Sequence, residues 1–451
     1  MKEEIRRNAV AKIKAGQPLF PGVLGYEDTV LPQLEHAVLA GHDIIFLGER
    51  GQAKTRMIRQ LTELLDEWMP IVHGSEINDD PYNPVSAHAK ALVDELGEGT
   101  PIDWVHRRDR FGEKLATPDT SIADLIGEVD PIKVAEGRYL SDELTLHYGL
   151  VPRTNRGVFA INELPDLAER IQVGLLNVLE ERDVQIRGYK IRLPLDVMLV
   201  ASANPEDYTN RGRMITPLKD RFGAQIRTHY PLEISTEVDI ARQESHLPTT
   251  DDVAGLNVEI PAFMEELIAT FTHLARSSPQ INQRSGVSVR LTVANMETMV
   301  AAATRRALRL GETEVVPRVS DLGALFASTA GKIEVESLEE GRDEEVIEHL
   351  LRGAILTVFK DHVSAESIRQ VIDAFEADLT LSAGDDLPVS AYADTLSKVP
   401  AMSAPVAGLV GESTSAGAKA SAMELLLEGL HLSKRLNKDA VGGRASYRAR
   451  A

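Results

Sequence analysis

Residues 43–55 place a lysine and a threonine at the end of a glycine-containing loop, a pattern that can bind phosphate. The apolar run Ile44–Leu47 predicts a short buried strand, and apolar residues at helical spacing after Thr55 predict a helix. Such a loop turns its N–H groups toward an anion, Lys54 can reach terminal phosphates, and the Thr55 hydroxyl can hold Mg²⁺. This phosphate loop consists of Gly48, Glu49, Arg50, Gly51, Gln52, Ala53, Lys54 and Thr55.

Ala53 stands where the G-x-x-x-x-G-K-[ST] pattern has its second glycine. Alanine is tolerated there if its φ angle is negative, as at the start of a helix, because only left-handed conformations penalise the Cβ atom. We therefore expect a negative φ at Ala53. The alternative for the whole segment is an ordinary turn with a surface lysine.

A second buried strand is predicted over residues 157–164, and it ends in Asn162 and Glu163. In a P-loop ATPase this position carries an acid that helps to hold Mg²⁺, followed by a glutamate that polarises water. Glu163 suits the second role. Asn162 keeps an oxygen acceptor for the metal but lacks the negative charge, so we expect weaker metal binding. The alternative is a plain strand end.

Three further polar residues follow in an order that suits the same chemistry. A third buried strand over 197–203 ends at Asn204, which could orient a water or the γ-phosphate; the alternative is a turn-forming Asn-Pro. Arg221 could stabilise phosphate charge across a subunit boundary, or simply pair with Asp220. Arg290, at the start of a predicted helix, could touch nucleotide or be solvated.

The order of these elements predicts an α/β fold, in which a parallel sheet is flanked by helices and followed by an α-helical lid domain. We expect the nucleotide-binding α/β domain over 1–232, with extra strands and an insertion between 71 and 155. Alternating residues around a Gly-Tyr turn predict a β-hairpin insertion over 184–193. Apolar residues at helical spacing dominate residues 233–380, and this pattern predicts the separate α-helical domain.

The last segment, 381–451, is expected to be a flexible linker and a C-terminal amphipathic helix. Residues 381–420 are rich in Ala, Ser, Pro, Gly and Val, which favours a linker or disorder. The leucine-rich stretch 423–432 predicts a helix that docks onto a partner or onto its own chain. The arginine-containing tail beyond it is expected to be mobile.

Composition restricts the function classes. The 451 residues include no cysteine, which excludes disulfides, thiolate metal sites and cysteine nucleophiles. The net charge of −20 makes nucleic acid an unlikely partner, because an acidic surface repels the phosphate backbone. No apolar run is long enough for a membrane span, and the Met-Lys-Glu-Glu start does not suit a targeting segment, so we expect a cytoplasmic protein.

Several motifs together carry a family resemblance. The sequence Gly51-Gln-Ala-Lys-Thr resembles the phosphate loop of MoxR-type AAA+ ATPases, in which alanine is familiar at this position. The stretch 199–207, with 218–223 after it, is similar to the ATPase subunit of magnesium chelatase (subunit I). The hairpin at 184–193 and the stretch 126–130 resemble the two insertions of that clade. The resemblance covers about residues 20–310.

The resemblance implies a P-loop AAA+ ring, commonly a hexamer, with ATP and Mg²⁺ bound between neighbouring subunits. It implies that Glu163 polarises water, that Asn204 is the first sensor, and that Arg221 reaches the neighbouring site. Arg290 would be the second sensor, Lys54 and Thr55 would bind phosphate and Mg²⁺, and Asn162 would lie at the metal. Such ATPases generally work with a partner that bears an integrin-type (VWA) metal-binding domain. This chain lacks an Asp-x-Ser-x-Ser motif, so that partner would be a separate polypeptide.

The leading hypothesis is therefore an ATP-hydrolysing motor that remodels a partner protein, either in a metal chelatase or as a MoxR-like chaperone. The alternative is a nucleotide-gated scaffold that binds ATP with little hydrolysis, which Asn162 favours. A DNA helicase shares the insertions but is disfavoured by the acidic charge.

Overall fold

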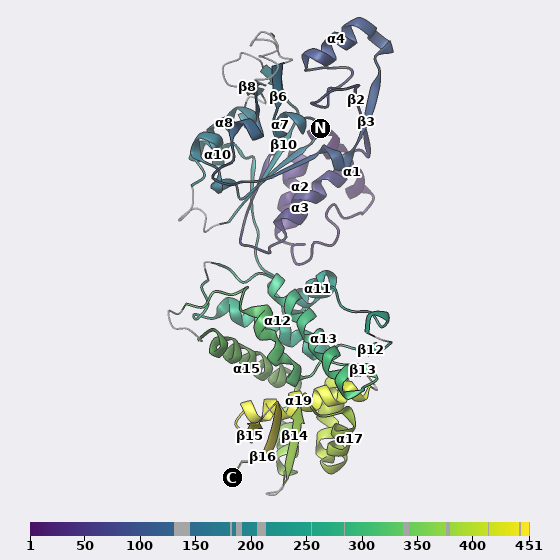
Figure 1. Cartoon of the computed structure of the whole chain (residues 1–451), viewed down its shortest axis with the longest axis vertical. Helices are drawn as coiled ribbons and strands as arrows, with labels where there is room; N and C mark the ends of the chain where they lie inside the picture. Colours follow the sequence, from purple (N-terminus) through teal and green to yellow (C-terminus); the bar gives the residue numbers. More distant parts are fainter. Residues whose placement is uncertain are drawn as a thin grey trace. The chain divides into compact units, whose positions relative to one another are not determined.

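A computed structural model describes residues 1–450 except 130–144, 181–182, 186–191, 205–212, 254, 284, 337–341, 376–378, 414 and 442. The chain divides into two compact units, Met1–His229 and Tyr230–Ala451 (Figure 1). This boundary falls a few residues before the one expected after residue 232.

The first unit is built on a five-stranded sheet in which every neighbouring pair of strands is parallel. The strand order is β11-β1-β10-β7-β4. In a parallel sheet all strands end at one edge, so the residues that follow them meet there. The strands of this sheet are β1 (Ile44–Leu47), β4 (Phe111–Leu115), β7 (Val158–Asn162), β10 (Met198–Ala203) and β11 (Ala224–Arg227).

Helices cover both faces of this sheet, because its central strands β1, β10 and β7 are apolar on both sides. Ile45, Phe159 and Leu199 pack with α8 and α10, whereas Ile44 and Val158 pack with α1, α2 and α3. Figure 1 shows α2 and α3 on one side of the strands, and α8 and α10 on the other. The helices of this unit include α1 (Lys2–Lys14), α2 (Val30–Ala40), α3 (Lys54–Gln60), α4 (Ala87–Leu96), α5 (Ile122–Leu125), α7 (Leu150–Arg153), α8 (Glu169–Glu180) and α10 (Thr216–Arg221).

Small antiparallel strand pairs extend the first unit, as expected for an insertion. They are β2 (Trp68–Val72) with β3 (Ile102–His106), β5 (Gly127–Val129) with β6 (Leu146–Tyr148), and β8 (Asp183–Gln185) with β9 (Arg192–Pro194). The last pair agrees with the predicted hairpin, whose turn lies outside the described residues, as does part of the stretch 126–130. The apolar spacing after Thr55 also predicts that Trp68 lies on the helix that follows the phosphate loop, but Trp68 is the first residue of β2.

The second unit is mainly helical, as the sequence predicted for residues 233–380. Its helices include α11 (Ile234–Glu244), α12 (Ala262–Ser277), α13 (Arg290–Leu310), α14 (Leu325–Thr329), α15 (Arg342–His362), α16 (Ala365–Asp373), α17 (Val389–Lys398), α18 (Ser403–Val410) and α19 (Ala416–Leu432). Two-residue strands β12 (Asn257–Val258) and β13 (Glu314–Val315) pair in parallel. The helix α12 packs against α15, and both contribute to one apolar core.

The prediction of a flexible C-terminal segment is wrong. Residues 381–420 contain α17, α18 and most of β14 (Thr380–Gly384), and the chain ends in the antiparallel strands β15 (Leu436–Val441) and β16 (Arg444–Ala449). Their apolar side chains belong to the same core as α12 and α15. The helix α19 is not amphipathic, because its residues from Ala420 to Leu430 are all buried.

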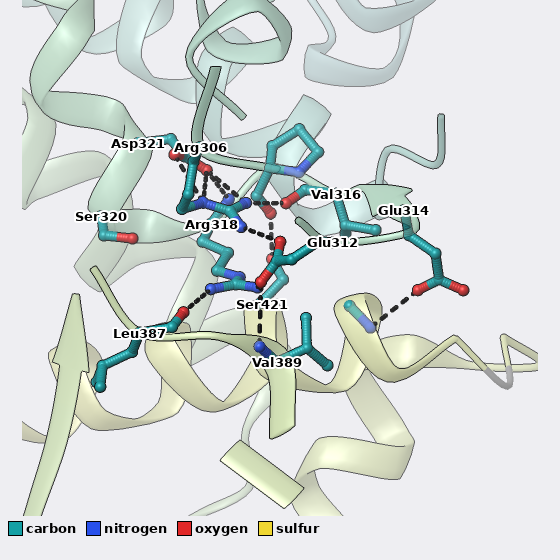
Figure 2. A network of polar contacts seen from close by, with 12 residues as sticks. Arg306, Glu312, Glu314, Val316, Arg318, Ser320, Asp321, Leu387, Val389 and Ser421 are labelled. Atoms are coloured by element: carbon teal, nitrogen blue, oxygen red, sulfur yellow. Dashed lines mark hydrogen bonds and ion pairs between the residues drawn. The ribbon is translucent and has the colours of Figure 1, made fainter. Parts of the chain in front are cut away.

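A buried network of charged side chains ties this segment to the rest of the second unit (Figure 2). Arg306 pairs with Glu312 at 2.7 Å and with Asp321 at 3.1 Å. Arg318 pairs with Glu312 at 2.7 Å and also donates to the Leu387 carbonyl at 2.9 Å. Buried charges of this kind are stable only when all partners are present. The network contacts this segment at two backbone groups, the Leu387 carbonyl and the Val389 N–H, which donates to Glu312 at 3.0 Å.

We expect Arg318→Ala to destabilise the second unit by about 3–5 kcal/mol, because it leaves the buried Glu312 carboxylate without one of its two cations. The matched control is Arg352→Ala, which removes an exposed i,i+4 pair with Glu348 and should cost less than about 0.5 kcal/mol. Hydrogen exchange of α19 amides measures both effects. Equal protection in the two variants would show that the network does not stabilise this unit.

Candidate functional site

The phosphate loop joins the end of β1 to the start of α3, as the sequence predicted. Gly48 is required there, because a Cβ atom at this position would lie 1.9 Å from the Thr228 hydroxyl oxygen and 2.2 Å from Gln52 Oε1. The Gln52 side chain ties the loop together: its Oε1 accepts from the Glu49 N–H at 3.0 Å and from the Thr228 hydroxyl at 2.7 Å. The loop is thus held by the end of the neighbouring strand β11.

The conformation of Ala53 differs from the expected one. Its φ angle is +55°, in the left-handed region, so the expectation of a negative φ is wrong. The glycine of the common pattern would adopt this conformation without penalty, whereas a Cβ atom there costs about 1–2 kcal/mol. Ala53 also packs against the core beside α3. The first turn of the helix therefore begins from a strained residue.

Lys54 lies at the carboxyl edge of the sheet, surrounded by oxygen acceptors. Its ammonium group donates to the Gly48 carbonyl, to the Glu49 carbonyl at 2.7 Å and to Asn204 Oδ1 at 3.0 Å. The side-chain amide of Asn204 in turn donates to Glu163 Oε2 at 2.8 Å. Lys54 and Asn204 are both buried, with exposures of 8% and 7%. Three predicted site residues are thus linked through hydrogen bonds.

Asn162 and Glu163 lie at the end of β7, next to β10. The buried Ser202 of β10 joins them, because its hydroxyl donates to Asn162 Oδ1 at 3.2 Å and accepts from the Glu163 N–H at 3.3 Å. Glu163 has a φ angle of +55°, a left-handed turn that directs the chain away from the strand. Ser202 was missed because one serine within an apolar run carries no signal of its own.

The three remaining predicted residues make no hydrogen bond to this cluster that the described contacts include. Thr55 is exposed on the first turn of α3. Arg221 is the last residue of α10 and donates to the Pro217 carbonyl at 3.1 Å. Arg290 begins α13 in the second unit and is exposed. Their roles toward nucleotide remain predictions.

A hollow of about 350 Å³ opens beside the phosphate loop. It is lined by Leu47, Gly48, Glu49, Gln52, Lys219, Arg227 and Thr228. Lys219 and Arg227 place two basic side chains next to the loop, which favours an anionic ligand. The hydroxyl of Tyr26 contacts the carbonyls of Gln52 at 3.1 Å and of His229 at 2.6 Å. Burial raises the pKa of Tyr26, so this hydroxyl stays protonated.

Comparisons with known proteins find sequence similarity to two groups. A family model described as the Sigma-54 interaction domain matches residues 136–222. The magnesium-chelatase 38 kDa subunit of Rhodobacter capsulatus is 29% identical over 242 residues, covering 50% of this chain and 61% of that protein. Magnesium-chelatase subunit ChlI of Nostoc sp. is 28% identical over 233 residues, covering 50% and 58%. The chain thus spans less than two thirds of either relative's length.

Solved structures give distant matches. A cryo-EM-based structure of the complex between subunits BchI and BchD of magnesium chelatase matches with 22% identity and a TM-score of 0.38. That match covers 73% of this chain and 100% of the other. NtrX from Brucella abortus matches with 14% identity and a TM-score of 0.41, over 79% of this chain and 68% of the other.

The parallel sheet, the phosphate loop after β1 and the polar ends of β7 and β10 define a P-loop protein of the AAA+ class. Within that class the chain is homologous to the magnesium-chelatase I subunits, which confirms the resemblance seen in its motifs. Among the described residues, no helix is both long enough and apolar enough to cross a membrane.

We expect Ala53→Gly to leave the stability of the first unit unchanged or to raise it by up to about 1 kcal/mol, because glycine adopts a φ of +55° without strain. The control is Ala11→Gly on the exposed side of α1, which should cost about 1 kcal/mol. Both tryptophans lie in the first unit, so denaturation followed by their fluorescence measures it. If Ala53→Gly were as costly as Ala11→Gly, Ala53 would not be strained.

Proposed function

We propose that this chain is an AAA+ ATPase that binds ATP with Mg²⁺ at the phosphate loop and hydrolyses it to remodel a partner protein. The hydrogen-bonded series Lys54–Asn204–Glu163 is the observation that carries this proposal. It brings a cation for phosphate, an amide that can sense a terminal phosphate, and a carboxylate that can accept a proton into one place.

The residues present suit a magnesium nucleotide. The Thr55 hydroxyl and the Asn162 amide oxygen are the kind of oxygen donors that Mg²⁺ takes, and they would hold it. The bound metal would neutralise charge on the β- and γ-phosphates. The N–H groups of the phosphate loop and Lys54 would bind the phosphates, Asn204 would orient the γ-phosphate, and Glu163 would accept the proton of the attacking water.

The assembly is part of the same proposal. We infer a homo-hexameric ring in which Arg221 reaches the nucleotide of the neighbouring subunit and Arg290 acts from the second unit. The partner would be a separate protein with an integrin-type (VWA) domain, in a metal chelatase or in a MoxR-like chaperone system. Support comes from the names of the relatives, which are subunits of magnesium chelatase. We also infer that the protein is cytoplasmic.

We expect Lys54→Ala to abolish ATP binding, since it removes the buried ammonium group of the phosphate loop. The control Lys90→Ala, at an exposed position on α4, should bind ATP as the wild type does. Equilibrium binding of a fluorescent ATP analogue measures both variants. Wild-type affinity in Lys54→Ala would contradict the proposed site.

We expect Glu163→Gln to lower steady-state phosphate release by about 10²-fold or more while ATP still binds, because the proton acceptor is lost and the shape is kept. The second candidate function is a scaffold that binds ATP without turning it over, which the neutral Asn162 beside Glu163 favours. Wild-type phosphate release no faster than that of Glu163→Gln would support the scaffold and contradict the enzyme. Asn162→Asp would then be expected to create turnover.

A further inference from the structure

A carboxylate that the sequence did not single out lies directly beside Asn162. Glu113, on the edge strand β4, accepts a hydrogen bond from Asn162 Nδ2 on its Oε1 atom at 2.6 Å. Its side chain is 25% exposed, and its other oxygen accepts from Arg59 Nη2 at 2.9 Å and Nε at 3.2 Å. The negative charge that is missing from residue 162 is therefore present one strand further along the sheet.

The direction of these contacts places Glu113 on the side of the sheet where the metal is expected. In the parallel register Glu113 is opposite Ala160, so it shares a face with Ala160 and Asn162. Ala160 packs in the core with α3. Glu113 and Asn162 thus face α3, the helix that begins at the phosphate loop.

The contact with Arg59 shows which side of α3 these residues meet. Arg59 lies four residues after Thr55 on the same helix, and residues four apart occupy one helical face. Because Arg59 binds Glu113, Thr55 is on the flank of α3 that is turned toward β4. The Thr55 hydroxyl, the Asn162 amide oxygen and the Glu113 carboxylate therefore lie toward one side of the phosphate loop.

The hydrogen bonds also fix the orientation of the Asn162 amide. Its nitrogen must donate to the Glu113 carboxylate, which can only accept, and its oxygen accepts from the Ser202 hydroxyl at 3.2 Å. A carboxylate bound to the amide nitrogen also draws negative charge onto the amide oxygen, because linked hydrogen bonds polarise one another. Glu113 is thus able to make a neutral ligand behave more like an acidic one.

We propose that Glu113 supplies the negative charge of the Mg²⁺ site that Asn162 lacks, and so acts as the positioning and charge-providing partner of Asn162. This inference rests on the proposed function, because it concerns the metal that accompanies the nucleotide. It predicts a metal site whose charge is shared by two strands, β4 and β7, instead of being carried by an acid at the end of β7.

The test measures metal affinity without turnover. The full-length chain is mixed with a substoichiometric amount of ADP, Mn²⁺ is added as the probe in place of Mg²⁺, and free Mn²⁺ is followed by its electron paramagnetic resonance signal. We expect Glu113→Gln to weaken Mn²⁺ binding by about tenfold or more, as loss of a partner of a metal ligand generally does. ADP binding in EDTA should be unchanged in this variant.

The decisive variants place a negative charge at residue 162, with or without the Glu113 carboxylate. Asn162→Asp should bind Mn²⁺ more tightly than the wild type, and Glu113→Gln combined with Asn162→Asp should return the affinity to near the wild-type value. Arg59→Ala is the matched control, because it removes the ion pair with Glu113 but keeps the carboxylate. It should bind Mn²⁺ at least as tightly as the wild type.

Some results would overturn the role of Glu113 and leave the proposed function intact. One is wild-type Mn²⁺ affinity in Glu113→Gln, and another is failure of Asn162→Asp to restore binding in the double variant. Weakening in Arg59→Ala equal to that in Glu113→Gln would likewise show that Glu113 only anchors α3. A wild-type chain that retains no ADP in EDTA would instead overturn the proposed function, and this inference with it.

Discussion

The candidate site depends on how one buried ammonium group is held. Lys54 is kept at the carboxyl edge of the sheet by two carbonyls of its own loop and by Asn204. A buried cation is stable only among such acceptors, so the loop and the end of β10 must keep their relative positions. The parallel sheet provides that rigidity, because β1 is hydrogen bonded to β10 on one side and to β11 on the other. Everything proposed for the site follows from this arrangement.

The sequence predicted most of this site because its residues follow apolar strands. The apolar runs that form β1, β7 and β10 are buried over nearly their whole length. The loop with Lys54 follows β1, Glu163 follows β7 and Asn204 follows β10, and each of these residue types is expected at a phosphate site. Glu113 could not be found in this way. Its strand β4 reads Phe-Gly-Glu-Lys-Leu, lies at the edge of the sheet and is only partly buried, so no apolar run marks it. The sequence offered one signal for Glu113: on a strand it shares a face with Phe111 and Leu115, so it would lie between two apolar side chains.

The C-terminal segment was misjudged because small residues indicate a linker in composition but permit close packing in three dimensions. A Cβ atom at Gly429 of α19 would lie 2.2 Å from the Phe359 ring, and one at Gly417 would lie 2.6 Å from Val316. The acidic residues of α19 are buried with partners: Glu424 meets the Tyr392 hydroxyl and Ser320. Burial raises the pKa of Glu424. Composition cannot reveal such long-range pairing, since each partner is distant in the chain.

The most direct measurement is an experimental structure of this chain with Mg²⁺ and a slowly hydrolysed ATP analogue. The account predicts that the terminal phosphates lie against the N–H groups of the phosphate loop. Lys54 would be turned from its carbonyl partners toward the phosphates, and Asn204 and Glu163 would lie beside the γ-phosphate. A nucleotide bound elsewhere, with Lys54 still held by Gly48, Glu49 and Asn204, would contradict it.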